Sequence, residues 1–402
     1  MRIIFLTIAR INSISEKGIY QDLLKKFNDE GHEIVIVTPV ERKYNQKTCV
    51  EIEGNVSVLK VRTPNLLKTN IIEKGIGIIL VENLFKNAIK KFFLNTKFDL
   101  ILYATPPITF TNLILYLKKR DNAYAYLLLK DIFPQNAVDL KMISSHGIFH
   151  KYFRSKEKQL YKVSDSIGCM SEANKKYLIE NNPEINENKI EVNPNSIYIN
   201  NIEKASYIKS FTVNIPDNKV LFVYGGNLGK PQGIDFLLET ISACRDLENI
   251  HFIIVGSGTE TRKIKKWFEL IKPHNATLIN ELGKDEYNTL LKACHVGLIL
   301  LHPDFTIPNY PSRILSYMEN SLPILSATDS VTDIGIESEK NGYGFSCRNG
   351  DIKSFKLLIE KLANNENLRK EMGEIGFNYM TDNFNVDLSY NIIMKHFEFL
   401  TN

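Results

Sequence analysis

The sequence predicts an α/β protein made of two successive domains, each a doubly wound parallel sheet. Three observations predict this fold. The 402 residues exceed the size of one typical core, short apolar runs alternate with segments of helical periodicity, and this alternation stops and restarts once. The interruption, from Asn181 to Asp217, is rich in Asn, Pro and Ser, and we expect the linker there. We therefore place the domains at 1–200 and 201–376, followed by a C-terminal segment at 377–402.

Each expected element follows from its own pattern. Ile234, Leu237, Leu238 and Ile241 recur at the spacing of one helix face, for example, and follow the apolar run 220–224. Two doubly wound sheets place their ligands at the carboxyl ends of the strands. The first half has expected strands at 2–8, 32–39, 98–103, 123–129 and 166–170, and expected helices at 19–28, 109–119 and 172–180. The second half has expected strands at 220–224, 252–255, 296–300 and 323–325, and expected helices at 234–245, 259–271, 285–293, 312–319 and 352–363.

Composition and charge exclude several classes of protein. No stretch approaches the roughly 18 apolar residues of a membrane-spanning helix, and the apolar start before Arg10 is too short for a secretory signal, so we interpret it as a first strand. The five cysteines form no CxxC pair, which fits a reducing cytoplasm. Residues 1–205 hold 30 Lys and Arg against 22 Asp and Glu, a net charge of +8, whereas residues 206–402 hold 20 against 24, a net charge of −4. A basic half favours an anionic surface or ligand, although plain solvation explains such an excess as well.

Glycine-rich turns after buried strands are the strongest candidates for a binding site. The apolar run from Val220 ends in Gly225 and Gly226, and a helix pattern starts a few residues later. Backbone N–H groups at such a turn favour an anion, usually a phosphate, although an ordinary strand-to-helix turn has the same pattern. Gly256 and Gly258, after another apolar strand, form a second turn of this kind. At a further helix start, Ser312 and Arg313 precede N–H groups, near Arg313, Ile314 and Leu315, that could hold a diphosphate, and Arg313 adds a bidentate donor.

These segments resemble the donor-side motifs of family 4 glycosyltransferases. The loop Gly225–Gly233 resembles their donor loop, and His302–Glu319 with Leu322–Asp329 resembles their second donor-side motif. The resemblance covers essentially the whole chain and is closest to the branch that builds bacterial capsule and O-antigen repeats, including transferases of the N-acetylfucosamine type. Further matches, in the family's order, are Tyr103–Thr109, Leu129–Gln135, Phe153–Asp165, Asn193–Ser196, the glycine-loop residue Gly18 and the closing helix 377–400.

The resemblance implies a fold and an activity. It implies two facing Rossmann-like domains (the GT-B fold), a C-terminal helix that crosses back to the first domain, and a metal-independent, anomer-retaining transferase without a cofactor. The first domain would bind the acceptor, a sugar on a polyprenyl diphosphate at the inner membrane face. The second would bind a nucleotide-sugar, with UDP as the expected nucleotide, in capsule or O-antigen synthesis. The protein would be cytoplasmic and peripherally attached to the membrane, with no nucleic-acid partner.

Several residues depart from the family pattern. Where many relatives carry an Arg and a later Lys in the donor loop, this chain has Asn227 and Gln232, and Lys230 between them is our candidate for the missing charge. The second Glu of the family's E-x7-E motif, which holds the ribose, falls at Ser316, and the first falls near Pro308. Glu319 or Asp304 are the candidate replacements.

Lys130 and Asp131 are the candidate catalytic residues. By the resemblance, Lys130 stands where relatives often carry a His and would stabilise the leaving phosphate, while Asp131 would orient the acceptor hydroxyl. The structural alternatives are a solvated strand end for Lys130 and a turn or helix-capping residue for Asp131. We expect no metal site, because His146 and His150 have no third ligand nearby and no Asp-x-Asp occurs.

Residues 82–97 form a basic amphipathic pattern. Its apolar stripe comprises Leu84, Phe85, Ala88, Ile89, Phe92 and Phe93. Such a helix can lie in a membrane interface, or it can pack on its own domain. Two rivals to a transferase also stay open at this point. One is a sugar-nucleotide epimerase, whose carboxylates and His we cannot place. The other is a catalytically silent partner subunit, which the altered donor loop would suit.

Overall fold

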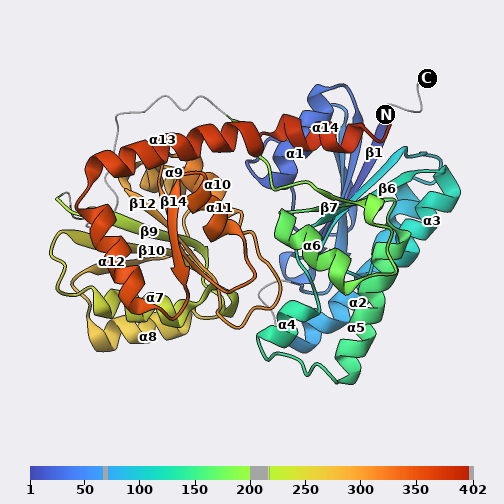
Figure 1. Cartoon of the computed structure of the whole chain (residues 1–402). Helices are drawn as coiled ribbons and strands as arrows, with labels where there is room; N and C mark the ends of the chain where they lie inside the picture. Colours follow the sequence, from blue (N-terminus) through green and yellow to red (C-terminus); the bar gives the residue numbers. More distant parts are fainter. Residues whose placement is uncertain (67–70, 200–215, 217, 398–402) are drawn as a thin grey trace. The chain divides into compact units, whose positions relative to one another are not determined.

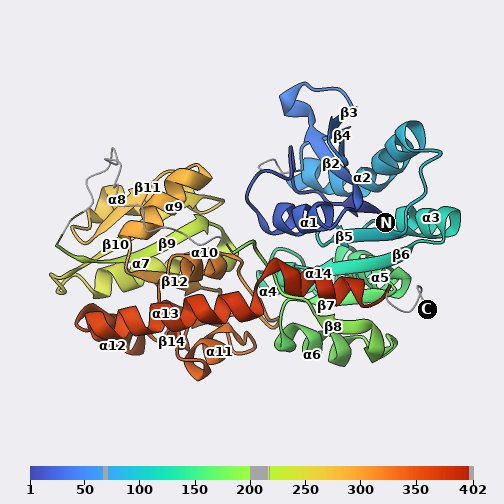
Figure 2. The same ribbon diagram turned by 90° about the horizontal axis from the view of Figure 1, so that it is seen from above.

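The computed structural model describes residues 1–66, 71–199, 216 and 218–397. The chain separates into two compact units. Unit 1 comprises Met1–Tyr198 and Val386–Asn402, and unit 2 comprises Ile199–Asn385. The boundaries predicted from the sequence fall after residues 200 and 376. Both units are α/β, with helices on both faces of a central sheet (Figures 1 and 2), as predicted.

Unit 1 contains an eight-stranded sheet in the order β3-β4-β2-β1-β5-β6-β7-β8. Its strands pair in parallel except for β3, which pairs antiparallel with β4. One face carries α1 and α14, whose apolar residues share a core with β1, β2, β5 and β6. The strands are β1 (Arg2–Leu6), β2 (Glu33–Glu41), β3 (Cys49–Glu53), β4 (Val56–Thr63), β5 (Leu100–Ala104), β6 (Tyr124–Leu129), β7 (Ser166–Cys169) and β8 (Ile190–Val192). The helices are α1 (Ile19–Asp29), α2 (Ile71–Phe92), α3 (Thr111–Asp121), α4 (Gln135–Asp139), α5 (Ile148–Val163), α6 (Glu172–Asn181) and α14 (Val386–Met394), with short 3-10 turns η1 (Arg42–Tyr44) and η2 (Glu187–Lys189).

Unit 2 contains a six-stranded parallel sheet in the order β11-β10-β9-β12-β13-β14. Apolar residues of α7, α8 and α12 pack on one face of it, where Phe236 and Phe355 meet edge to face at 5.1 Å. The strands are β9 (Val220–Asn227), β10 (Ile250–Ser257), β11 (Ala276–Ile279), β12 (Val296–Leu300), β13 (Ile324–Thr328) and β14 (Gly344–Arg348). The helices are α7 (Ile234–Ala243), α8 (Thr261–Ile271), α9 (Lys284–Ala293), α10 (Arg313–Glu319), α11 (Ile334–Lys340), α12 (Ile352–Ala363) and α13 (Glu366–Asn383), with the 3-10 turn η3 (Lys230–Gln232).

The end of the chain returns to unit 1, but not as the single helix expected at 377–400. It divides into α13, which starts at Glu366 after the capping residue Asn365, and α14. The side chain of Ser389 on α14 donates a 2.6 Å hydrogen bond to the buried Asn193 of unit 1. Lys26 on α1 forms a 2.7 Å ion pair with Asp387. A core face and polar pairs therefore attach α14 to unit 1.

The expected amphipathic helix at 82–97 is the second half of α2, which ends at Phe92. Phe85, Ala88 and Ile89 of its apolar stripe are buried, and Phe85 stacks on Phe110 with ring centroids 5.5 Å apart. The stripe therefore packs chiefly on its own domain, which is the second of the two alternatives. No helix of the described residues is long and apolar enough to cross a membrane.

Candidate functional site

The carboxyl ends of β9 and β10 meet in unit 2 as bare backbone. Gly226 of β9 pairs with Gly256 of β10 in the strand register. The φ angle of Gly256 is +143°, and a Cβ atom there would lie 1.8 Å from the carbonyl oxygen of Gly226. Gly226 also has a positive φ, +108°, but the space around it is open. Gly256 is therefore required by the close approach of the two strands, whereas the open space at Gly226 leaves its backbone accessible to a ligand.

Two further glycines are required by close packing around this edge. A Cβ at Gly225 would lie 2.0 Å from the hydroxyl of Tyr287, and one at Gly258 would lie 2.4 Å from the backbone of Leu228. The Gly225 N–H donates a 3.0 Å hydrogen bond to the hydroxyl of Tyr317 on α10. Three buried or half-buried tyrosines thus lie under the glycine turn: Tyr224, Tyr287 and Tyr317.

Arg313, the first residue of α10, lies against this tyrosine cluster. Its Nη2 donates a 2.6 Å hydrogen bond to the side-chain oxygen of Gln232, and its Cζ lies 4.5 Å from the centroid of the Tyr224 ring. The Tyr224 hydroxyl also donates to the Gln232 oxygen, at 3.3 Å. The Nη1 of Arg313 is buried and has no hydrogen-bond partner within the described residues. An unpartnered buried guanidinium nitrogen costs free energy unless an acceptor reaches it, and a phosphate oxygen is the kind of acceptor that arginine suits best.

The start of α10 differs from the expectation in one respect. The N–H of Ile314 donates to Pro311 O at 3.2 Å, and that of Leu315 donates to Ser312 O at 3.1 Å. These i→i+3 bonds tighten the first turn, so two of the three amides predicted to be free for a diphosphate already have acceptors. The side chains of Ile314 and Leu315 are buried in the core. Of the residues expected at this helix start, Arg313 has a side-chain nitrogen without an acceptor among the residues that the structure describes, and the side chain of the preceding Ser312 is exposed.

The substituted family positions surround the same edge. Asn227 and Lys230 are exposed, and Asn227 lies opposite Ser257 in the strand register. Ser316 lies one turn into α10, whereas Glu319 is its last residue, roughly 9 Å along the helix axis from Arg313. Asp304 follows β12 and donates its N–H to His302 Nδ1 at 3.3 Å.

A different carboxylate, absent from the sequence predictions, lies beside the glycine turn. The hydroxyl of Ser257, the last residue of β10, donates a 2.6 Å hydrogen bond to Glu281, which follows β11. The tyrosines were missed as well. Tyr317 stands four residues after Arg313, a spacing that places both on one helix face, and this signal could have identified it. Tyr287 has no comparable local signal.

The catalytic candidates lie in unit 1. Nζ of Lys130 donates to Asn193 O at 3.3 Å, and burial lowers the pKa of Lys130 to about 7. Asp131 accepts a 2.7 Å hydrogen bond from the side chain of Asn136, in the second position of α4. Lys130 is therefore no solvated strand end, and Asp131 makes the contact of a turn residue. Gly18 is the N-cap of α1, and its N–H donates to Asp22 at 3.3 Å.

A metal site is not evident in the described part of the chain, where no three His, Cys, Asp or Glu side chains gather in a possible ligand set. His146 lies in the loop before α5, whereas His150 lies in that helix. The five cysteines are all unpaired.

Known proteins similar to this chain are glycosyltransferases. Residues 208–379 match the family described as glycosyl transferases group 1. The probable glycosyltransferase WbjE of Pseudomonas aeruginosa is 23% identical over 370 residues, which cover 89% of this chain and 90% of WbjE.

Solved structures share the fold over the whole chain. Sucrose-phosphate synthase from Thermosynechococcus elongatus has a TM-score of 0.79 at 14% identity. The superposition covers 100% of this chain and 99% of the synthase. HepE from Anabaena, solved in complex with UDP, has a TM-score of 0.66 at 12% identity, with 99% of each chain covered. The predicted two-domain fold of the GT-B type is thus confirmed.

Proposed function

The chain is a glycosyltransferase, and we propose that it moves a sugar from a UDP-sugar to a saccharide carried on a polyprenyl diphosphate. In this proposal the transfer retains the anomeric configuration, needs no metal and serves the synthesis of a capsule or O-antigen. The acceptor would be met at the inner face of the cell membrane, where the protein would be peripherally attached. The resemblance of the sequence motifs to capsule and O-antigen transferases supports this acceptor class.

The observation that carries the proposal is the buried, unpartnered Nη1 of Arg313, whose guanidinium lies over the ring of Tyr224, two residues before Gly226 on β9. A nucleoside diphosphate brings two adjacent phosphates, and a guanidinium next to accessible backbone can bind one of them while the other approaches the glycines. HepE, which has the same fold, was solved with UDP, and this supports UDP as the nucleotide here.

The chain's own residues then have distinct tasks. Arg313 would neutralise the departing diphosphate, so that charge developing as the glycosidic bond breaks is stabilised without a metal ion. Gln232 and the Tyr224 ring hold the guanidinium in place before the donor arrives. Lys130 and Asp131 stay candidates for work at the acceptor, as predictions from the resemblance.

The proposal is tested by transfer itself. Purified protein is supplied with a panel of UDP-, GDP- and ADP-sugars and with a lipid-linked saccharide, and nucleotide release and glycolipid products are followed with and without chelator. We expect UDP release that needs the lipid-linked acceptor and survives chelation, and a product with the donor's anomeric configuration by NMR. Nucleotide binding without transfer to any lipid-linked saccharide would contradict the proposed acceptor. Absence of both would favour the catalytically silent partner subunit.

A further inference from the structure

Exposed apolar side chains gather at the start of α5, in unit 1, and in the loop before it. Ile148 and Phe149 are 85% and 72% exposed, and Met142 and Tyr152 are also exposed. The next aromatic residue, Phe153, turns inward and meets Phe133 edge to face at 5.0 Å. The helix therefore has an ordinary inward face, and its exposed residues Ile148, Phe149 and Tyr152, like Met142 in the preceding loop, are additional to that face. We call Met142, Ile148, Phe149 and Tyr152 the apolar tip.

Cationic side chains continue the exposed face of α5 beyond the apolar tip. The helix carries five Lys and Arg residues and a single acidic residue, Glu157. Glu157 is buried and forms an ion pair with Arg154, so it offers little negative charge to the surface. Lys151, Lys158 and Lys162 are exposed. At about 100° per residue, Lys151 and Lys162 lie within about 60° of Ile148 around the helix axis, whereas Phe149 lies on the opposite flank from Lys151 and Lys158.

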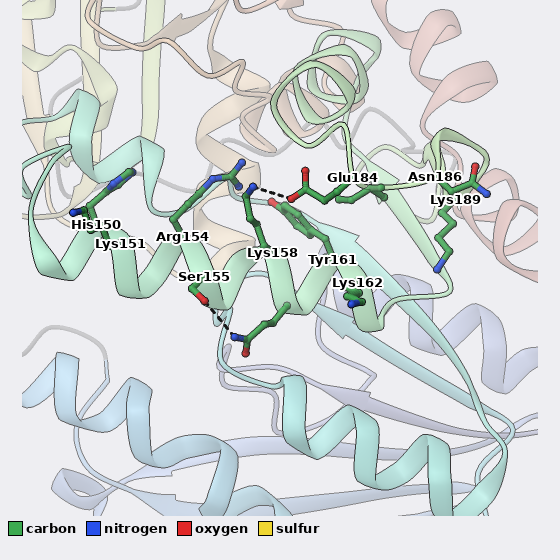
Figure 3. A pocket seen from close by; sticks show the side chains of 12 residues that line it. His150, Lys151, Arg154, Ser155, Lys158, Tyr161, Lys162, Glu184, Asn186 and Lys189 are labelled. Carbon is green, nitrogen blue, oxygen red and sulfur yellow. Dashed lines mark hydrogen bonds and ion pairs between the residues drawn. The ribbon is translucent and has the colours of Figure 1, made fainter.

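A groove of about 720 Å³ lies alongside these cations, between α5 and the segment Glu184–Lys189 (Figure 3). Lys151, Arg154, Lys158 and Lys162 line it from α5, and Lys189 lines it from the opposite wall. Glu184, its one acidic lining residue, forms a 2.8 Å ion pair with Lys158. The groove is thus positively charged and can receive anionic headgroups.

We propose that the apolar tip and the cationic face of α5 dock unit 1 on an anionic lipid bilayer. This inference rests on the proposed lipid-borne acceptor and names the surface that would bring the protein to it. Apolar side chains of an interfacial helix enter the boundary between headgroups and acyl chains, about 5–10 Å deep. Lys and Arg beside them interact favourably with anionic headgroups. An apolar end followed by a cationic face on one helix meets both requirements, whereas the predicted stripe at 82–97 is largely buried in its own domain.

Vesicle binding by the full chain tests this surface without donor or acceptor. Flotation is measured with phosphatidylcholine vesicles and with vesicles that also contain about one third phosphatidylglycerol. The key variant, Ile148→Asp with Phe149→Asp, changes the apolar tip. The matched control is Ile336→Asp, at a 70% exposed isoleucine on α11 of unit 2. We expect wild type and control to float with anionic vesicles at low salt, and the tip variant to bind at least roughly tenfold more weakly.

A fluorescent probe reports insertion directly. The chain has one tryptophan, Trp267 on α8 of unit 2. In a Trp267→Phe background, the Phe149→Trp probe should shift its emission to the blue and be quenched by brominated lipid. The native tryptophan of wild type should show neither effect. Lys151→Glu with Lys162→Glu should weaken binding to anionic vesicles and flatten its dependence on salt.

The vesicle-binding results can be told apart from a failure of the proposed transferase function, because they are measured without donor or acceptor. No flotation of wild type with anionic vesicles, or equal binding by the tip variant and the control, would overturn the inference. Unquenched emission from the Phe149→Trp probe on floated protein would overturn it as well, because another surface would then make the contact. If UDP-sugar turnover persists in solution while vesicle binding fails, the inference is wrong and the transferase proposal is untouched.

Discussion

Replacing Arg313 with methionine should separate ligand binding from folding. The unpartnered Nη1 is the group expected to reach the diphosphate. A hydrogen bond to a charged group contributes about 1.5–3 kcal/mol, so its loss should weaken UDP binding by about tenfold to about 150-fold. Uridine, which has no phosphate, should bind wild type and variant equally. Isothermal titration with UDP and uridine measures both affinities.

The free energy of unfolding of the ligand-free protein should respond differently. Methionine removes a buried, incompletely paired charge, and Gln232 keeps its hydrogen bond from the Tyr224 hydroxyl. The lost guanidinium contacts and the removed desolvation cost oppose each other, so we expect a change within about 1 kcal/mol. Urea unfolding without ligand tests this. A variant destabilised by about 3 kcal/mol with unchanged UDP affinity would show that Arg313 is a structural residue and does not bind the diphosphate.

Two further predictions concern buried groups. Gly256→Ala should destabilise unit 2 by about 3 kcal/mol or more, because the added Cβ would collide with the carbonyl oxygen of Gly226. The control Gly350→Ala, at φ +103° in open space, should lose only about 1–2 kcal/mol of stability from backbone strain. Equal urea midpoints for the two variants would contradict this prediction. Burial lowers the pKa of Lys130 to about 7, so the unfolded chain holds this proton more tightly and stability should rise as pH increases from about 7 toward about 10. Lys130→Met should have a larger free energy of unfolding than wild type at pH 7 and should lack the rise in stability between about pH 7 and about pH 10. Parallel plots of unfolding free energy against pH for the two proteins would contradict the burial of the Lys130 amine.

The regular elements were predictable where a strong local pattern specified them. The buried runs that became β1, β5, β6, β9 and β12 are apolar on both faces, and parallel strands of a covered sheet require this. The hairpin of β3 and β4 was missed, because β3 is a largely exposed edge strand of five residues, too short for its alternation of Val50 and Ile52 with glutamates to stand out. A turn at Gly54, between two runs rich in valine and isoleucine, was the available signal.

The glycine edge was predictable and the cluster beneath it was not. Gly225, Gly226 and Gly256 follow buried strands, and the α/β pattern alone brings such turns to one edge. The contacts that position Arg313 join it to residues 81 and 89 positions away, Gln232 and Tyr224. Buried tyrosines read as ordinary core residues in a sequence, so only the fold reveals that they surround a guanidinium.

The end of the chain shows a further limit. The pattern of 377–400 is continuously helical in character, and the change from α13 to α14 near Phe384 depends on long-range contacts. Two polar contacts in unit 1 illustrate this: the hydrogen bond between Ser389 and Asn193 and the ion pair between Lys26 and Asp387. Each contact joins residues that are far apart in the sequence. Local periodicity cannot distinguish one long helix from two short ones in such a case.

The most direct test of the account is a thermal-shift titration of wild type and Arg313→Met with UDP, GDP and ADP, each with and without chelator. A ligand that binds only the folded state raises the melting temperature by mass action. We expect UDP to raise the melting temperature of wild type equally with and without chelator, and to raise that of the Arg313 variant much less. No shift with any nucleotide at millimolar concentration, or an equal shift in both proteins, would contradict the claim that Arg313 and the glycine edge bind the donor diphosphate.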